Sequence, residues 1–176
     1  ASYGVYVVTN VYDNNVFNNT ITTRGLDGIG IAVDNTAYQN KVFNNNITTY
    51  VGTGHGIYIT RDAFNNSVYD NNITTSGNHS YGITLNNNAY NNTLYNNIIS
   101  TSNISAYGIL LFDEVFNNTI YDNNITTKNA TGSYGIYLLQ NINNNTFYRN
   151  RISSLAIGIL INGSGQTAAQ SAAQRT

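Results

Sequence analysis

A 26-residue repeat is the feature that most constrains the fold of this chain. The sequence Gly56-Ile57-Tyr58-Ile59, a polar corner and then Val68–Thr75 recurs with little change along most of the 176 residues. The marker glycines are Gly4, Gly30, Gly56, Gly82, Gly108 and Gly135, with a weaker equivalent at Gly158. Their spacing is 26 residues four times, then 27 and 23. A fixed repeat of this length is typical of a solenoid, in which each repeat stacks on the next.

Apolar residues occupy three sets of equivalent positions in each repeat. Alternating positions after the glycine, such as Ile57 and Ile59, have the period of a strand with one buried face. The other two sets are Val16, Val42, Val68, Leu94, Ile120 and Phe147, and then Ile21, Ile47, Ile73, Ile99, Ile125 and Ile152. No segment has the roughly 10–12 residues at helical period that a helix needs. The repeat therefore predicts an all-β protein, a right-handed parallel β-helix (β-solenoid) of about six 26-residue, three-strand coils. Right-handed coiling is expected because parallel crossovers almost always have that hand.

Asparagine and aromatic residues hold the same register. The two asparagine columns are Asn14, Asn40, Asn66, Asn92, Asn118 and Asn145, and Asn19, Asn45, Asn71, Asn97, Asn123 and Asn150. Asparagine tolerates the left-handed backbone of sharp corners, and its amide can donate and accept along a stack. We therefore predict two asparagine ladders. An aromatic column is expected to stack inside the coil and to end at Asn143: Tyr12, Tyr38, Phe64, Tyr90 and Phe116.

Composition limits the partners and the compartment. The net charge is −1 and only 9% of residues are charged, so the chain offers no basic surface for nucleic acid. No segment approaches the roughly 18 consecutive apolar residues of a membrane span. Asn-x-Ser/Thr sequons are frequent, which favours an extracellular or cell-surface location. The sequons predicted as candidate glycosylation sites are Asn46, Asn72, Asn78, Asn103, Asn124 and Asn129.

The domain organisation follows the repeat. We expect one β-helix domain over residues 1–162 and a C-terminal tail rich in Gly, Ala, Gln and Ser over residues 163–176. We expect no capping segment before the first coil, and an uncovered coil would present unpaired backbone groups that invite another chain. The residues expected at the two assembly ends are Tyr3, Gly4, Val5, Ile157, Ile159 and Ile161.

The repeat carries a family likeness. The sequence Tyr134–Leu138 and the pattern at Asn118–Ile125 resemble the parallel β-helix repeats of NosD-like proteins and of archaeal surface proteins, over residues 3 to about 161. This resemblance implies the fold more than a function, since such proteins include sugar hydrolases, lyases, epimerases, binding modules and surface proteins. Kinship to NosD-like proteins implies an association with copper, but the chain has no Met or Cys to support it.

Candidates for catalysis and metal binding are few. Asp62 and Glu114 are the best acid pair, in one column two coils apart or about 9.6 Å by strand spacing, but no base completes a site except Arg61. His55 replaces the tyrosine that precedes the glycine in other coils, so it is expected to be a packing residue. His79 has no second ligand nearby in sequence. We therefore predict no catalytic residues, no metal site and no cofactor, and the chain is not expected to be an enzyme.

A second aromatic column is the strongest candidate for a contact surface. Its members directly follow an inward residue and should face outward: Phe17, Phe43, Tyr69, Tyr95, Tyr121 and Tyr148. Three interpretations are open: lateral assembly, contact with carbohydrate, or simple cover by neighbouring loops.

Two functions from different classes remain. The leading hypothesis is an extracellular structural β-solenoid whose copies pair end to end into a filament or surface layer. The alternative is a carbohydrate-binding or carbohydrate-active β-helix that uses the exposed aromatic column, with cell-surface glycans as partners.

Overall fold

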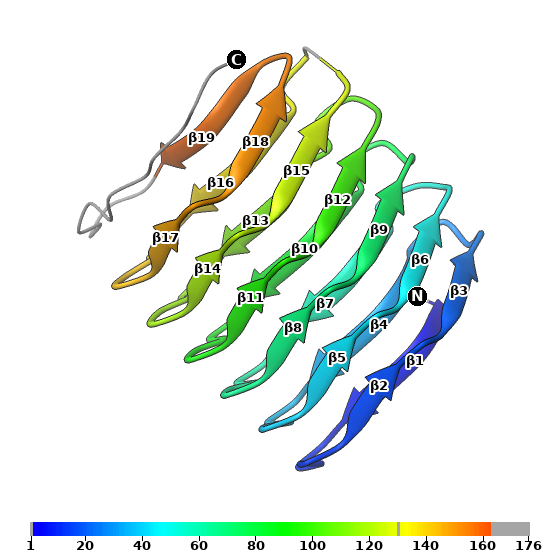
Figure 1. The fold of residues 1–176 in the computed structure, drawn as a ribbon, viewed down its shortest axis with the longest axis vertical. Helices are drawn as coiled ribbons and strands as arrows, with labels where there is room; N and C mark the ends of the chain where they lie inside the picture. Colours follow the sequence, from blue (N-terminus) through cyan, green and yellow to red (C-terminus); the bar gives the residue numbers. More distant parts are fainter. Residues whose placement is uncertain (1, 130, 163–176) are drawn as a thin grey trace.

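The computed structural model describes residues 2–129 and 131–162, and every regular element in them is a β-strand. Nineteen strands wind into stacked coils, with β1 at one end and β19 at the other (Figure 1). All strand pairs are parallel and join a strand to its equivalent in the next coil. The predicted parallel β-helix is confirmed. The tail predicted over residues 163–176 lies outside the described residues.

Three parallel sheets form the walls of the coil. Sheet 1 contains β1 (Ser2–Val8), β4 (Gly28–Asp34), β7 (His55–Ile59), β10 (Tyr81–Asn86), β13 (Ile109–Phe112), β16 (Tyr134–Leu139) and β19 (Ile157–Asn162). Sheet 2 contains β2 (Asn15–Phe17), β5 (Lys41–Phe43), β8 (Ser67–Tyr69), β11 (Thr93–Tyr95), β14 (Thr119–Tyr121) and β17 (Thr146–Tyr148). Sheet 3 contains β3 (Thr20–Thr23), β6 (Asn46–Thr49), β9 (Asn72–Thr75), β12 (Ile98–Thr101), β15 (Asn124–Thr127) and β18 (Arg151–Ser154).

The three predicted apolar sets line the interior. Ile57 pairs with Ile31 and Ile83 in sheet 1, and each is fully buried. Val68 occupies the same place in sheet 2 and Ile73 in sheet 3. All belong to one continuous hydrophobic core that runs the length of the coil. Since every coil repeats this packing, the core is a column of identical layers.

Both asparagine ladders are confirmed. The Nδ2 atom of Asn45 donates to Oδ1 of Asn71 at 3.0 Å, and Asn71 repeats this contact to Asn97 at 3.0 Å. Each Oδ1 also accepts the backbone N–H of the preceding asparagine in its ladder, as between Asn45 and Asn71 at 3.1 Å. The other ladder has the same pattern, with Asn40 donating to Asn66 at 3.1 Å. Buried amides are thus hydrogen-bonded from coil to coil.

The corners depend on residues that accept positive φ. Most non-glycine residues with positive φ are Asn or Asp, such as Asn44 (φ 53°), Asp70 (φ 54°) and Asn96 (φ 53°), which hold one position in successive coils. Short polar side chains make this left-handed conformation less costly because they hydrogen-bond locally. Asp and Asn interchange there because the backbone, rather than a charge, sets the requirement.

The marker glycines are needed for space, not for φ. A Cβ built on Gly82 would overlap Cγ2 of Ile99 and lie 2.5 Å from the carbonyl oxygen of Gly108. Neither neighbour is free to retreat, since one lies in the core and the other is backbone of the next coil. The sheet 1 strand of such a coil can therefore pack against the sheet 3 isoleucine only if the marker position is glycine.

One expectation about the core is wrong. The column from Tyr12 to Phe116 does stack, with ring centroids 5.0–5.1 Å apart, and it ends at Asn143. It lies at the corner between sheets 1 and 2 and not inside the coil: Tyr12 is 55% exposed, and the later rings are half-buried. The interior position belongs to the preceding residue, such as Ala37 or Ala63, which is fully buried. Because that preceding residue takes the inward position, the ring that follows it lies on the outer side of the corner.

Candidate functional site

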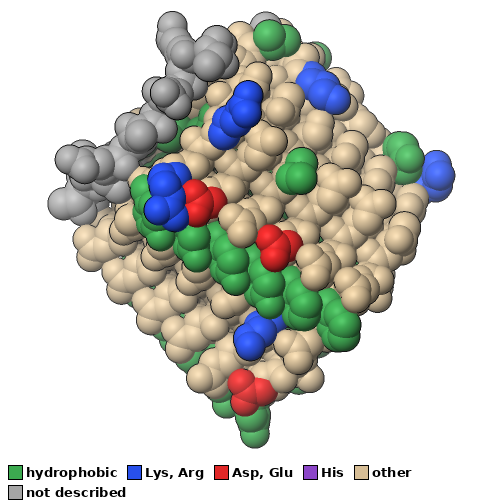
Figure 2. Space-filling model, viewed as in Figure 1, with side chains coloured by type: hydrophobic (Ala, Val, Ile, Leu, Met, Phe, Trp, Pro, Cys, Tyr) green, Lys and Arg blue, Asp and Glu red, His purple; other side chains and the backbone are tan. Residues whose placement is uncertain are grey.

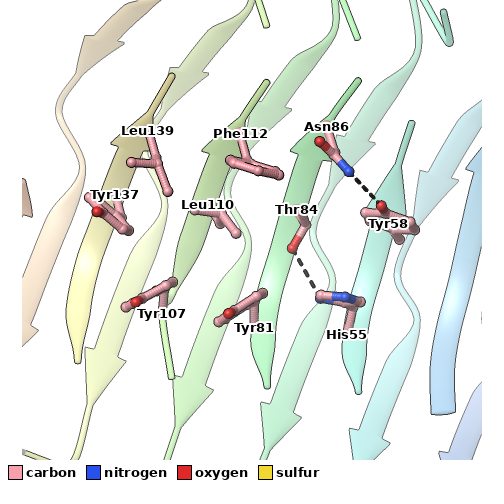
Figure 3. Close-up of a pocket in the computed structure, with 10 residues that line it drawn as sticks. All are labelled: His55, Tyr58, Tyr81, Thr84, Asn86, Tyr107, Leu110, Phe112, Tyr137 and Leu139. Atoms are coloured by element: carbon pink, nitrogen blue, oxygen red, sulfur yellow. Dashed lines mark hydrogen bonds between the residues drawn. The ribbon is translucent and has the colours of Figure 1, made fainter. Parts of the chain in front are cut away.

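The outer face of sheet 1 carries a groove of about 300 Å³ that spans β7, β10, β13 and β16. Figure 3 shows one row of rings formed by His55, Tyr81 and Tyr107, and a second row formed by Asn86, Phe112 and Leu139. Between the rows, Tyr58, Thr84, Leu110 and Tyr137 complete the lining. Cavities of this size hold small ligands or part of an extended chain.

The groove exists because outward side chains of one column differ in size. Each member of the column lies between two inward residues of its strand, as Thr84 lies between Ile83 and Leu85. Tyr58 and Tyr137 are large and lie at the two ends. Thr84 and Leu110 are shorter, are buried, and form the floor between them. A regular strand stack thus gains a trough from two short side chains between two tyrosines.

Polar atoms along the groove are held by side chains from neighbouring coils. The hydroxyl of Thr84 lies 3.2 Å from Nδ1 of His55. The Nδ2 atom of Asn86 donates to the hydroxyl of Tyr58 at 2.7 Å. Oδ1 of Asn86 is buried and has no hydrogen-bond partner among the described residues. The lining therefore offers fixed hydroxyl, amide and imidazole groups beside apolar ones.

Three titratable groups of the groove, His55, Tyr81 and Tyr107, are uncharged near neutral pH. Burial lowers the pKa of His55 to about 4, partly opposed by Asp27. Its ring is stacked on Tyr58, with centroids 4.8 Å apart, and lies 5.1 Å from Tyr81. Burial raises the pKa of Tyr107 to about 12, helped by nearby tyrosines. Burial also raises the pKa of Tyr81. The His55 imidazole is therefore neutral, and the Tyr81 and Tyr107 phenols keep their protons.

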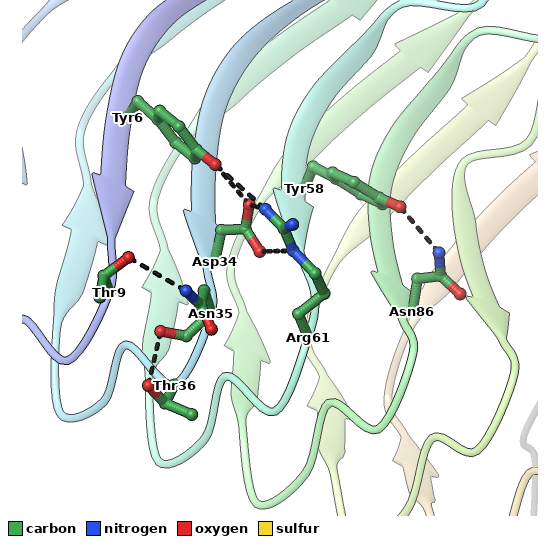
Figure 4. Close-up of polar contacts among 8 residues, drawn as sticks. All are labelled: Tyr6, Thr9, Asp34, Asn35, Thr36, Tyr58, Arg61 and Asn86. Carbon is green, nitrogen blue, oxygen red and sulfur yellow. Dashed lines mark hydrogen bonds and ion pairs between the residues drawn. The ribbon is translucent and has the colours of Figure 1, made fainter.

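A charged cluster lies beside the groove on the same sheet (Figure 4). Nε of Arg61 donates to Oδ1 of Asp34 at 2.6 Å, and its Nη2 donates to Oδ2 of Asp34 and to the hydroxyl of Tyr6. The Tyr6 hydroxyl donates to Oδ2 of Asp34 at 2.7 Å. Burial alone would raise the pKa of Asp34, but hydrogen bonds from Arg61 and Tyr6 outweigh it and hold this pKa below its usual value. The cluster neutralises its own buried carboxylate.

The predicted outward aromatic column forms a continuous stripe on sheet 2 (Figure 2). We call Phe17, Phe43, Tyr69, Tyr95, Tyr121 and Tyr148 the aromatic stripe. Neighbouring rings stack with centroids 4.8–5.1 Å apart and planes within 5°. Phe17 is 47% exposed, and the four middle rings are half-buried. Since each ring covers the face of the next, the stripe presents ring edges to a partner rather than the open faces on which a sugar would stack.

The predicted sequon residues lie on the surface. Asn46, Asn72 and Asn124 begin strands of sheet 3 and are exposed, as their outward position predicts. Asn78 is exposed as well. Asn103 and Asn129 are partly buried in the corner loops: Nδ2 of Asn103 donates to the carbonyl of Ser76, and Oδ1 of Asn129 accepts the N–H of Thr131. Glycosylation of these six residues stays a prediction.

The residues predicted at the assembly ends lie on β1 and β19, the outermost strands of sheet 1. Tyr3, Ile157 and Ile161 are exposed. Gly4 is exposed, whereas Val5 and Ile159 are partly buried against the core. A role for these residues in assembly stays a prediction.

The structure does not bring the candidate acids together into a site. Asp62 accepts a hydrogen bond from Asn88, the residue between it and Glu114 in their column. Arg61 is directed to Asp34 instead. Across residues 2–129 and 131–162 there is no group of three or more His, Cys, Asp or Glu side chains that could hold a metal ion. The same residues contain no helix long and apolar enough to cross a membrane.

The groove residues were not predicted as a site from the sequence. His55 does pack between tyrosines as predicted, but Tyr58, Leu110 and Tyr137 were not singled out. The available signal was alternation: any residue between two inward positions of sheet 1 must face outward. A change from large to small and back along that position would then have indicated a hollow.

Comparisons with known proteins agree with the architecture. The family model described as a right-handed beta helix region matches residues 1–152. Among solved structures, a double mutant of the periplasmic alginate epimerase AlgG is similar, with a TM-score of 0.66 and 18% sequence identity. The match covers 98% of this chain and 48% of that one, so this chain spans about half the length of the epimerase structure. No curated protein matches the sequence significantly.

Proposed function

This chain belongs to the right-handed β-helix family, and we propose that it is a carbohydrate-binding member whose groove on sheet 1 holds a glycan. The observation that carries the proposal is the groove itself, where rings and aliphatic side chains lie beside hydroxyl, amide and imidazole groups. Sugars have apolar ring faces and polar edges, so they match a surface of this mixed character. The groove also follows the coil axis over four coils, which suits an extended chain.

Location and lineage are proposed together with this function. We propose an extracellular or envelope location, which the surface sequons support and which agrees with the periplasmic name of the structurally similar epimerase. The finer kinship to NosD-like proteins and archaeal surface proteins rests on the repeat motif and is part of the same proposal. Binding, rather than catalysis, is proposed because the described lining contains no carboxylate.

Glycan-array binding of two matched variants tests the proposal. Tyr107→Ala removes a ring from the groove wall, whereas Tyr95→Ala removes a half-buried stacked ring from the aromatic stripe. Each variant loses one ring from a stack, so their costs in stability are comparable. We expect the unmodified chain and Tyr95→Ala to bind the same glycans, and Tyr107→Ala to lose them. If only Tyr95→Ala loses glycan binding, the carbohydrate site is on the aromatic stripe. If no form of the chain binds a glycan, the proposed carbohydrate-binding function is rejected.

End-to-end assembly into a filament or surface layer is the second candidate. It is favoured by exposed apolar residues on the outermost described strands, with Tyr3 at one end and Ile157 and Ile161 at the other. Outermost strands also carry backbone donors and acceptors that a further parallel strand could pair with. The partner in this case is another copy of the chain.

Negative-stain electron microscopy of the 176-residue chain at several concentrations tests assembly. Filaments of uniform width that disappear in an Ile161→Lys variant would support it. Ile98→Lys is the matched control, because Ile98 is an exposed isoleucine on sheet 3 in the middle of the coil stack. Isolated short rods at every concentration would contradict assembly and leave the groove as the sole proposed function.

A further inference from the structure

We infer that the groove selects uncharged glycans and rejects uronic acids and other anionic sugars. This inference rests on the proposed function and adds the chemical class of the ligand. The inferred ligand class also differs from alginate, which is a polyanion and appears in the name of the structurally similar epimerase.

The lining of the groove contains no charged side chain. Its ten residues are His55, Tyr58, Tyr81, Thr84, Asn86, Tyr107, Leu110, Phe112, Tyr137 and Leu139. None of them is Lys, Arg, Asp or Glu. The walls therefore supply hydrogen bonds and apolar contact but no counter-ion for a carboxylate.

His55 is the one lining residue that could become a cation. His55 is packed against two tyrosine rings and its Nδ1 faces the hydroxyl of Thr84. This packing disfavours a charged imidazole, consistent with a pKa of about 4. At neutral pH the imidazole therefore contributes a neutral polar group.

Arg61 is a cation on the same face, beside the groove. Figure 4 shows the guanidinium of Arg61 directed toward Asp34 and Tyr6, while the Tyr58 hydroxyl turns toward Asn86. Asp34 is only 3% exposed, so its carboxylate depends on Arg61 for a charge partner. Recruiting Arg61 to a ligand would leave that buried carboxylate unpaired, which is strongly unfavourable. The charge of Arg61 is already paired with Asp34.

An anionic sugar in this groove would lose water without gaining a cation. Partial burial of an unpaired carboxylate beside Leu110 and Phe112 is unfavourable because the charge prefers water. A neutral sugar has no such cost, and its hydroxyl groups can exchange hydrogen bonds with the tyrosine hydroxyls. The groove should therefore discriminate by charge before it discriminates by stereochemistry.

Isothermal titration of the 176-residue chain tests the inference with two panels of equal length, neutral oligosaccharides and oligouronates. We expect neutral ligands to bind with an affinity that is insensitive to salt, and oligouronates to bind at least about 100-fold more weakly. In a Leu110→Lys variant, which places an ammonium group on the groove floor, oligouronate binding should rise and become salt-sensitive. Leu110→Met is the control for altered packing, and thermal melts verify that both variants fold.

The outcomes separate the inference from the function on which it rests. Oligouronates that bind the unmodified chain as tightly as neutral glycans, with loss on Tyr107→Ala, would overturn the charge selectivity but keep the groove as a glycan site. If neither the neutral oligosaccharides nor the oligouronates bind, the proposed function and this inference are both rejected.

Discussion

Asn71 shows how a single side chain joins three coils. Its Nδ2 donates to the carbonyls of Val42 and Tyr69 at 2.9 and 3.0 Å and to Oδ1 of Asn97. Its Oδ1 accepts two hydrogen bonds from Asn45. No aliphatic residue, and no carboxylate, can both donate and accept in this way. Asparagine is therefore required at this position by hydrogen bonding as well as by the corner.

The first prediction concerns that ladder. Asn71→Asp should destabilise the chain by about 3 kcal/mol or more, because the carboxylate cannot donate and leaves several buried acceptors unpaired. Asn72→Asp, one residue later, is the control: its side chain is exposed and makes one 3.3 Å contact to Asn46. That change should stay within about 0.5 kcal/mol. Urea unfolding measures both, and equal losses would contradict the ladder as a source of stability.

The second prediction follows from His55. Its folded pKa of about 4 lies below the ordinary 6.5, so the unfolded chain takes up the proton first as pH falls. Stability should be highest above about pH 6.5 and decline toward pH 4, by up to about 3 kcal/mol from this residue. Asp34, whose pKa is lowered, adds a loss at still lower pH as its carboxylate is protonated.

His55→Tyr isolates the histidine contribution, because tyrosine holds this position in the next two coils at Tyr81 and Tyr107. The free energy of unfolding of this variant should no longer decline between pH 6.5 and 4. The loss that Asp34 causes at lower pH should remain. His79→Gln is the control, since His79 is exposed, and it should keep the whole profile. Denaturant unfolding at several pH values across this range measures the profiles of both variants and of the unmodified chain. If the free energy of unfolding of His55→Tyr falls as steeply with pH as that of the unmodified chain, His55 is not responsible for the decline.

At the scale of one element, the strands of sheet 1 are set by the glycine that packs against the isoleucine of sheet 3. Gly82→Ala should cost about 1–3 kcal/mol, because the new methyl group overlaps Ile99 and the backbone of Gly108. Gly158→Ala is the matched change in the last coil, where the new Cβ would lie 3.9 Å from Ile152. Thermal unfolding should separate them, and similar losses would contradict the packing explanation.

The strands could be predicted from the sequence because the same pattern of apolar positions recurs in six coils. Positions such as Val68 and Ile73 are apolar in every coil, and each had to face inward for a core to exist. The corner stack was misplaced for a physical reason: the sequence shows that Tyr38 and Phe64 share a column, but not that Ala37 and Ala63 take the inward position at this corner and turn the rings outward.

The groove could not be predicted in the same way, because it arises where the repeat varies. Thr84 and Leu110 differ from Tyr58 and from each other, so alternation places them on the outer face but no repeated residue type marks the position as a hollow. A hollow depends on which neighbours are large and how their rings turn. Tyr137 lies at 71° to Tyr107, whereas Tyr81 and Tyr107 are stacked. Ring orientation of this kind follows from packing in three dimensions.

At the scale of the whole molecule, each sheet of the coil presents a different surface. Sheet 1 carries the uncharged groove and the Arg61–Asp34 cluster. Sheet 2 carries the aromatic stripe, whose rings cover one another. The stripe remains a prediction as a lateral contact, and the ends of the coil remain a prediction as assembly surfaces. These roles are compatible, because a rod can associate through its ends while a side face holds a ligand.

The position at which a glycan binds is the most direct test of the proposed groove function. Methyl NMR of the leucine-labelled chain, titrated with a neutral oligosaccharide from the array, reports this position. Leu110 and Leu139 line the groove, whereas Leu94 is a fully buried core residue behind the aromatic stripe. Saturable shifts of the Leu110 and Leu139 methyl signals, with Leu94 unmoved, are the predicted result. Shifts at Leu94 with Leu110 and Leu139 unmoved would place the ligand on the stripe and contradict the account.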